Sequence, residues 1–265
     1  MHKYDTILVG NFALFTIKTK GGQTMSNGTE SKKPSIKQLA TLAGFITECL
    51  AEFLNLERVQ YWLKNKTELK RKLREVFSIT DEYGDIRRQW EQFYKNQFGW
   101  DMDFSLVLIP TRPEVGSWRL LFIAKGLTMN RGFEQCKKLF KSWRYNDDLD
   151  KAIPINARNA NENYAVWVRD GIEPDAEHLG KSTRQVDPDM KIGITVLERI
   201  IFEIKYFLET GSRLDTKGVT FCSGSRFSGG IVPSCYWSPA SGKFRVDWYN
   251  LDVSNSGSGV RSAVS

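Results

Sequence analysis

The sequence predicts an α+β protein, with a helical N-terminal part followed by a mainly antiparallel sheet packed on one long apolar helix. Three observations lead to this prediction. Between residues 35 and 100, apolar side chains recur at the three- and four-residue spacing of helices. After residue 100, short apolar runs bounded by turn residues are typical of antiparallel strands. One strongly apolar helical pattern, at 195–209, lies among these strands.

The first segment, residues 1–34, is expected to be an extension and a flexible linker. A short hairpin is predicted for Tyr4 to Lys18 around Gly10-Asn11, and Gly21 to Pro34 has the Gly-, Ser- and Asn-rich composition of linkers. Met25 lies within that linker, so translation could begin at either Met1 or Met25.

The helical region is predicted to span 35–100. Ser35 and Gln38 have the capping-box spacing, and apolar residues at helical spacing follow as far as Leu54. Further helical patterns cover 56–77 and 86–98.

An α+β domain is expected over 101–253, with a disordered tail of small residues at 254–265. Thr195 and Glu198 repeat the capping-box spacing at the start of the central helix, and Gly211 is a natural C-terminal cap. A second helix is predicted at 130–140, and loops at 147–163 and 171–191. Strands are predicted at 104–110 and 118–124 as a hairpin, and at 143–145, 164–169, 219–222, 232–237 and 244–248.

Composition and charge restrict the function classes. A hydrophobic fraction of 41% excludes a chain disordered throughout. The net charge of +7 favours an anionic partner such as nucleic acid, an anionic membrane surface or a phosphorylated small molecule. No apolar stretch approaches the ~20 residues that span a bilayer, so we expect a cytoplasmic protein without a transmembrane segment. Four widely spaced cysteines are typical of free thiols, although Cys222 and Cys235 are close enough in sequence to pair.

The C-terminal half resembles a family of hypothetical proteins from uncultured, small-genome bacteria. The resemblance lies in Tyr164 to Asp170, the helix from Thr195 to Tyr206 and Cys222 to Arg226, with further likeness at 126–130 and 147–150. It implies a bacterial source and no established activity, so it assigns no catalytic residue.

A Gly-rich turn, Ser223-Gly224-Ser225-Arg226, is the best candidate for binding phosphate. Consecutive backbone N–H groups in such a turn form an anion-binding nest, and an arginine adds a bidentate donor. The Gly-Lys-Ser/Thr ending of a Walker loop is missing. The alternative is a β-turn that only joins two strands.

Arg169 and the carboxylates Asp170, Glu173 and Glu198 are the candidates for ligand binding and acid–base or metal chemistry. Arg169 and Asp170 stand where a strand passes into a long loop, a common position for functional side chains. The alternative is that these carboxylates serve as caps and ion pairs. No Cys-x-x-Cys or His-x-x-x-His set indicates zinc, so we expect no metal centre of that kind.

Basic and aromatic residues supply a separate nucleic-acid hypothesis. A helical run carries Lys66, Lys70, Arg71 and Arg74, which could follow a phosphate backbone or form a solvated helix face. Trp237 and Trp248 are predicted as cross-strand neighbours around the Ser241-Gly242 turn, serving either as a stacking platform or as sheet core.

The preferred hypothesis is a cytosolic binding protein for an anionic partner, either nucleic acid or a nucleotide-like, phosphate-bearing ligand. The alternatives are a metal-dependent phosphoester hydrolase and a protein-interaction subunit that uses the helical N-terminal part. The sequence leaves open whether any reaction is catalysed, which cofactor is used and which oligomer forms.

Overall fold

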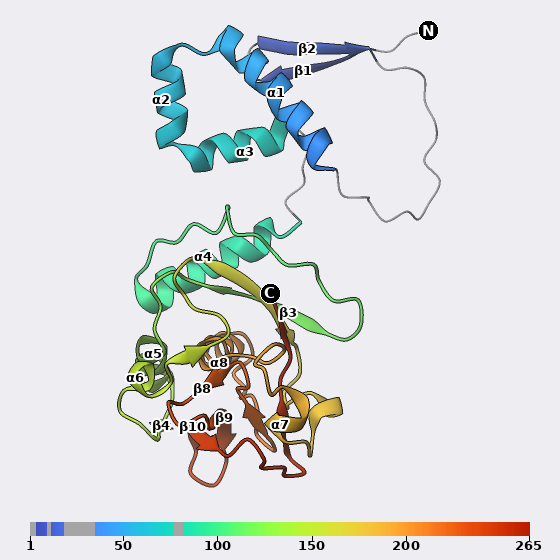
Figure 1. Cartoon of the computed structure of the whole chain (residues 1–265). Coiled ribbons are helices and arrows are strands. Elements are labelled where there is room, and N and C mark those ends of the chain that lie inside the picture. The colour runs from blue at the N-terminus through green and yellow to red at the C-terminus, as the bar shows by residue number, and fades with distance from the viewer. Residues whose placement is uncertain (1–3, 10–11, 19–34, 77–81) are drawn as a thin grey trace. The chain divides into compact units, whose positions relative to one another are not determined.

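The chain divides into two compact units, Met1–Glu82 (unit 1) and Tyr83–Ser265 (unit 2). The computed structural model describes residues 4–9, 12–18, 35–76 and 82–265 (Figure 1). The division lies earlier than the predicted boundary at residue 100, because α4, Gly84–Phe98, packs Trp90, Phe93 and Tyr94 into the core of unit 2. The predicted linker at 21–34 lies outside the described residues.

Unit 1 contains a hairpin and three helices. The hairpin consists of β1, Tyr4–Val9, and β2, Phe12–Lys18, which pair antiparallel as predicted. The helices are α1, Ile36–Phe53; α2, Leu56–Lys64; and α3, Lys66–Val76. Ser35 caps α1 in a capping box with Gln38, so the predicted start of this helix is confirmed.

Unit 2 has an α+β fold, and most of its strand pairs are antiparallel. One sheet has five strands in the order β11-β7-β9-β10-β4, and a second has three in the order β12-β6-β3. A small pair, β5-β8, accompanies them. The elements after α4 are β3, Trp118–Ile123; α5, Met129–Leu139; β4, Ser142–Arg144; α6, Leu149–Ala152; β5, Ile155–Asn156; β6, Tyr164–Arg169; η1, Ala176–His178; α7, Thr183–Val186; α8, Val196–Thr210; β7, Val219–Phe221; β8, Ser225–Arg226; β9, Val232–Ser238; β10, Lys243–Tyr249; β11, Ser258–Val260; and β12, Ala263–Val264.

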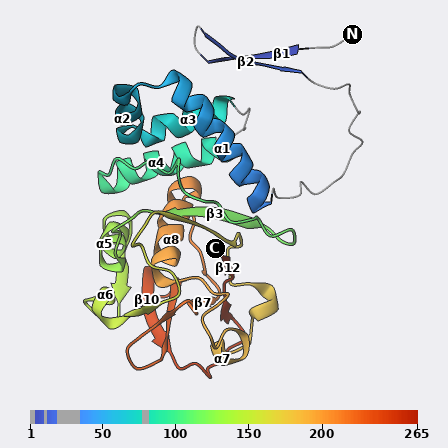
Figure 2. The same ribbon diagram turned by 45° about the horizontal axis from the view of Figure 1, so that its top comes forward.

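Helix α8 is the centre of unit 2. It lies beside β3 of the three-stranded sheet (Figure 2) and also contacts β9 of the five-stranded sheet. Every residue from Val196 to Ile204 is buried, which is why this helix is apolar around most of its circumference. The Thr195–Glu198 capping box and the left-handed Gly211 (φ 69°) confirm both predicted ends.

The predicted strand at 104–110 is wrong, and so is its hairpin with 118–124. β3 pairs antiparallel with β6 instead, while 104–110 has no regular structure. Side chains donate to three carbonyls of this segment: Arg87 to those of Phe104 and Val107, and Trp167 to that of Pro110 at 2.9 Å. At these three positions side chains therefore take the place of a partner strand.

The predicted disordered tail at 254–265 is also wrong. β11 pairs parallel with β7 of the five-stranded sheet, and β12 pairs antiparallel with β6 of the three-stranded sheet. Small residues here permit close packing: a Cβ at Gly259 would lie 2.9 Å from the carbonyl oxygen of His178. The C-terminal segment thus joins the two sheets. The predicted loops at 147–163 and 171–191 contain the short elements α6, β5, η1 and α7.

Candidate functional site

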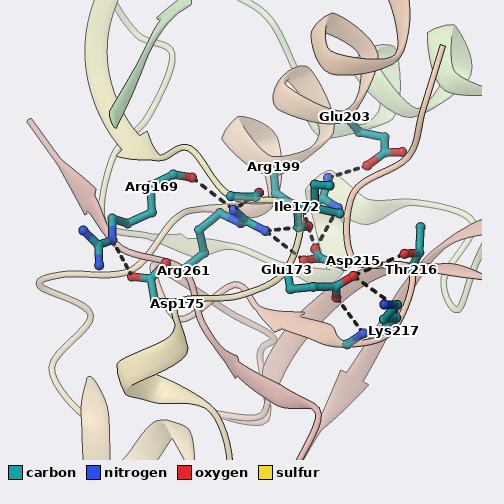
Figure 3. A network of polar contacts seen from close by, with 12 residues as sticks. Arg169, Ile172, Glu173, Asp175, Arg199, Glu203, Asp215, Thr216, Lys217 and Arg261 are labelled. Carbon is teal, nitrogen blue, oxygen red and sulfur yellow. Dashed lines mark hydrogen bonds and ion pairs between the residues drawn. The ribbon is translucent and has the colours of Figure 1, made fainter. Parts of the chain in front are cut away.

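A buried cluster of four charged residues lies between α8 and the C-terminal segment (Figure 3). Arg199 and Glu203 stand one turn apart on α8, Asp215 follows the helix, and Arg261 lies between β11 and β12. All four have 0% exposure. The two Asp215 carboxylate oxygens accept hydrogen bonds from Arg199 and Arg261, each at 2.8 Å, and Arg199 also donates to Glu203 at 2.8 Å.

This cluster is closed to ligands. Arg261 also donates to the backbone carbonyls of Arg169, Gly171 and Ile172, at 3.0, 2.7 and 3.2 Å. Burial raises the pKa of Glu203 above its ordinary value, and the neighbouring Arg199 opposes that shift. Because no member is exposed, we assign the cluster a structural role. The only sequence signal was an Arg–Glu pair at i,i+4 within an apolar helix.

The three predicted catalytic carboxylates each have different partners. Asp170 accepts from Nε of Arg119 at 2.9 Å. Glu173 accepts from the backbone N–H groups of Lys217 and Gly218 at 3.1 and 2.7 Å, which fixes the loop before β7 (Figure 3). No hydrogen bond or ion pair between described residues joins Asp170, Glu173 and Glu198 to one another, and none of the described His, Cys, Asp and Glu residues form a group of three or more suited to a metal ion.

Glu198 is fully buried and saturated with donors. Arg158 donates to it twice, at 2.6 and 2.8 Å, and the Tyr164 hydroxyl and the Thr195 N–H add bonds of 3.0 and 2.8 Å. Burial alone would raise the pKa of Glu198, but Arg158 and these other donors lower it below its ordinary value. The carboxylate therefore stays ionised at neutral pH and anchors the start of α8.

Arg169, a predicted ligand-binding residue, is half-buried and already has partners. Its side chain is 23% exposed, pairs with Glu177 at 2.6 Å and lies over the ring of Trp118 at 5.4 Å. The guanidinium is thus already held by an ion pair and a stacking contact.

The Gly/Ser turn directs its polar groups into the fold. The Ser223 hydroxyl donates to Asp187 at 2.6 Å, and the Ser225 hydroxyl donates to Asn156 at 2.7 Å. Arg226 donates to the carbonyls of Ser223 and Ser225 at 2.6 and 2.8 Å. Both serines have 0% exposure, so this arrangement matches the alternative in which the turn is structural.

The two predicted stacking tryptophans do not face each other. In the β9–β10 register Trp237 is opposite Phe244, and Trp248 is opposite Pro233. Both side chains are half-buried against the main core, and Trp237 also packs against Arg213, with 4.5 Å between the guanidinium carbon and the ring centroid. The prediction that they are cross-strand neighbours is wrong because it placed the strand pairing about four residues out of register.

The opposite face of the five-stranded sheet carries a row of three other side chains. Arg245 on β10 is opposite Tyr236 on β9 and opposite Trp143 on β4. Its guanidinium carbon lies 4.0 Å from the Trp143 ring centroid and 5.9 Å from that of Tyr236. We call these residues the aromatic row. Sequence reasoning missed it because the three residues meet only through the strand register.

The aromatic row lies away from the core. Phe244 and Val246, which flank Arg245, are buried, so the alternation of β10 directs Arg245 to the other face. Trp143, Tyr236 and Arg245 are all half-buried. Lys243, two residues before Arg245 on the same face, adds a further cation, while Asp247 pairs with Arg245 at 2.9 Å.

The predicted basic helix residues all lie on α3 of unit 1. Lys66 and Arg71 are exposed and Lys70 is half-buried, while the side chain of Arg74 lies outside the described residues. Neither α1 nor α2 has a buried residue. Several large apolar side chains of α1 are well exposed, including Ile36 at 87% and Phe45 at 57%.

Comparison with other proteins assigns no relative. The sequence matches no protein-family model, no curated protein and no solved structure. Within the described ranges, no helix has the length and apolar character needed to cross a membrane.

Proposed function

We propose that this protein binds single-stranded nucleic acid or a nucleotide-like ligand on the face of the five-stranded sheet that carries the aromatic row. The observation behind this proposal is the cross-strand arrangement of Trp143, Arg245 and Tyr236, which presents two rings and a guanidinium on one sheet surface. Bases stack on such rings whatever their sequence, and an arginine contributes both stacking and phosphate contacts.

The charge of the protein supports the same partner. A net charge of +7 attracts a phosphate backbone. On this face Lys243 is a cation beside Arg245, whose charge is partly offset by its ion pair with Asp247. In the metal-dependent hydrolase alternative, Asp170, Glu173 and Glu198 would have to converge, whereas their hydrogen bonds go to separate partners.

The test measures binding of the full chain to a fluorescein-labelled 12-mer of deoxythymidine and to an RNA of mixed sequence. Base stacking contributes about 1–3 kcal/mol per base. Trp143→Ala and Tyr236→Ala should therefore each weaken binding by roughly five- to 150-fold.

Trp118→Ala is the matched control, because Trp118 stacks with Arg169 on the three-stranded sheet. We expect it to bind as tightly as the unaltered chain. Equal losses in the control and in the aromatic-row variants, or no loss in any of them, would contradict the proposal.

A protein-interaction subunit is the second candidate, favoured by the exposed apolar residues of α1. Light scattering after size-exclusion chromatography tests self-association, and Phe45→Ser should reduce the apparent mass if α1 mediates it. A monomer at all concentrations would leave this candidate only with partners other than itself.

A further inference from the structure

Helix α1 of unit 1 carries an apolar stripe with the spacing of paired helices. Alternate steps of three and four residues define positions a and d of a heptad, which face a partner helix. We call these residues the α1 seam: Ile36, Leu39, Ala43, Ile46, Leu50 and Phe53. All of them are exposed except Ile46, which is half-buried. Because α1 has no buried residue, the described part of unit 1 leaves this apolar seam uncovered.

The positions beside the seam carry no charge. Heptad positions e and g flank a and d, and charged residues there often set the choice of partner. In α1 these flanking positions hold Ala40, Leu42, Thr47 and Cys49. The charged residues of the helix, Lys37, Glu48 and Glu52, lie at the outer positions b, c and f. A second copy of α1 therefore meets no like charge at the contact.

The seam is complementary to itself when two copies run antiparallel. With the helix centres aligned, Ile36 faces Phe53 of the second copy, Leu39 faces Leu50, and Ala43 faces Ile46. Each layer then sets a small or medium side chain against an equal or larger one, as well-packed cores do. A parallel pair would place Ala43 against Ala43 and Phe53 against Phe53, a thin layer and a bulky one. In the antiparallel pair both copies use the same surface, as a two-fold dimer requires.

We infer that the partner of α1 is a second copy of this chain, bound antiparallel through the α1 seam. The inference deepens the second candidate function, the protein-interaction subunit, and rests on it. Association removes the apolar side chains of both seams from water, which is the main favourable term in most protein–protein contacts. The seam lies in unit 1 and the aromatic row in unit 2, so a variant in one surface leaves the residues of the other unchanged.

Sedimentation equilibrium of the full chain measures the association directly. We expect a dimer that dissociates on dilution. Leu39→Asp places an unpaired carboxylate against Leu50 of the second copy, so it should raise the dissociation constant at least about ten-fold. Leu106→Asp is the matched control, because Leu106 lies in unit 2 and is 48% exposed, close to the 50% of Leu39. The control should dissociate like the unaltered chain.

Paired charges test the antiparallel register and separate it from a loss of folding. Leu39→Lys combined with Leu50→Glu places each lysine opposite a glutamate of the second copy only if the helices are antiparallel. Leu39→Lys combined with Leu50→Lys places like charges at the same layers. The first variant should therefore dimerise at least about ten-fold more tightly than the second. Circular dichroism verifies that the two variants have the same helix content.

Three results would overturn the inference. One is a chain that stays monomeric at its highest soluble concentration, which would leave the second candidate function only with other partners. Another is a dimer that Leu39→Asp and Leu106→Asp weaken equally, or that neither of them weakens. The third is the same dissociation constant for both charge-pair variants, which would exclude the antiparallel seam.

Discussion

Replacing Asp215 by alanine tests whether the buried charge cluster holds unit 2 together. In the native protein its carboxylate accepts two hydrogen bonds from Arg199, at 3.0 and 2.8 Å, and one from Arg261, at 2.8 Å. Asp215→Ala removes the negative charge that faces both guanidinium groups. Arg199 keeps Glu203 at 2.8 Å, whereas Arg261 keeps only backbone carbonyls.

The expected cost follows from burial of the cluster. Removing one partner of a buried ion pair costs about 3–5 kcal/mol, because the remaining charge is left without compensation in a medium of low dielectric. Two arginines with 0% exposure depend on Asp215, so we expect a loss near the upper end, about 5 kcal/mol. Domains have unfolding free energies of about 5–15 kcal/mol, so the variant should be close to unfolded at 37 °C.

Urea unfolding followed by tryptophan fluorescence measures this loss. Trp62 is the only tryptophan of unit 1, so most of the signal reports unit 2. The control is Asp189→Ala, which removes an exposed partner of Lys191 and should change stability by less than about 0.5 kcal/mol. If Asp215→Ala costs less than about 1 kcal/mol, the reasoning from buried charge is refuted.

Three further predictions concern elements that the structure assigns to stability. Glu198→Gln should cost about 1.5–3 kcal/mol at pH 7, because charge-assisted bonds from Arg158 are lost. Because folding lowers the pKa of Glu198, the ionised carboxylate contributes its full stabilisation above pH 4.5, the ordinary pKa of a glutamate. This stabilisation is lost as the pH falls through the folded-state pKa, so the urea curves of variant and native protein should converge as the pH falls below 4.5. Gly224→Ala should cost about 1–3 kcal/mol in the same assay, since its Cβ would lie 2.5 Å from the Gly193 carbonyl oxygen; a neutral effect would reopen the phosphate-binding interpretation of this turn. Truncation after Gly257 removes β11, β12 and Arg261, so it should abolish the cooperative thermal transition of unit 2 in calorimetry, whereas retention of that transition would mean that the C-terminal strands are dispensable.

The sequence predicted the features that depend on neighbouring residues. The capping boxes at Ser35 and Thr195 involve side chains three residues apart, so their spacing is visible in the chain itself. The burial of α8 follows from a periodic apolar pattern, and the α+β class follows from the change of period after residue 100. These signals place helices well because helical contacts are local.

Features that depend on distant residues were missed. The pairing of β3 with β6 joins segments about 45 residues apart, and the register of β9 with β10 decides which aromatic side chains meet. The C-terminal segment contains many small residues and was predicted to be disordered, but Arg261 pairs there with Asp215 at 2.8 Å. Composition identifies segments with few apolar residues. It does not show that a charged residue such as Arg261 has an ion-pair partner far away in the sequence.

The two candidate surfaces for an anionic partner lie in different units, and this separation has a physical consequence. Lys66, Lys70 and Arg71 on α3 would contribute mainly phosphate contacts. The affinity that such contacts provide falls steeply as the salt concentration rises. Trp143 and Tyr236 would contribute mainly stacking, which is far less sensitive to salt. If this protein binds nucleic acid, loss of the Trp143 and Tyr236 rings should lower the affinity at every salt concentration without changing the slope. Charge reversal on α3 should make the slope shallower.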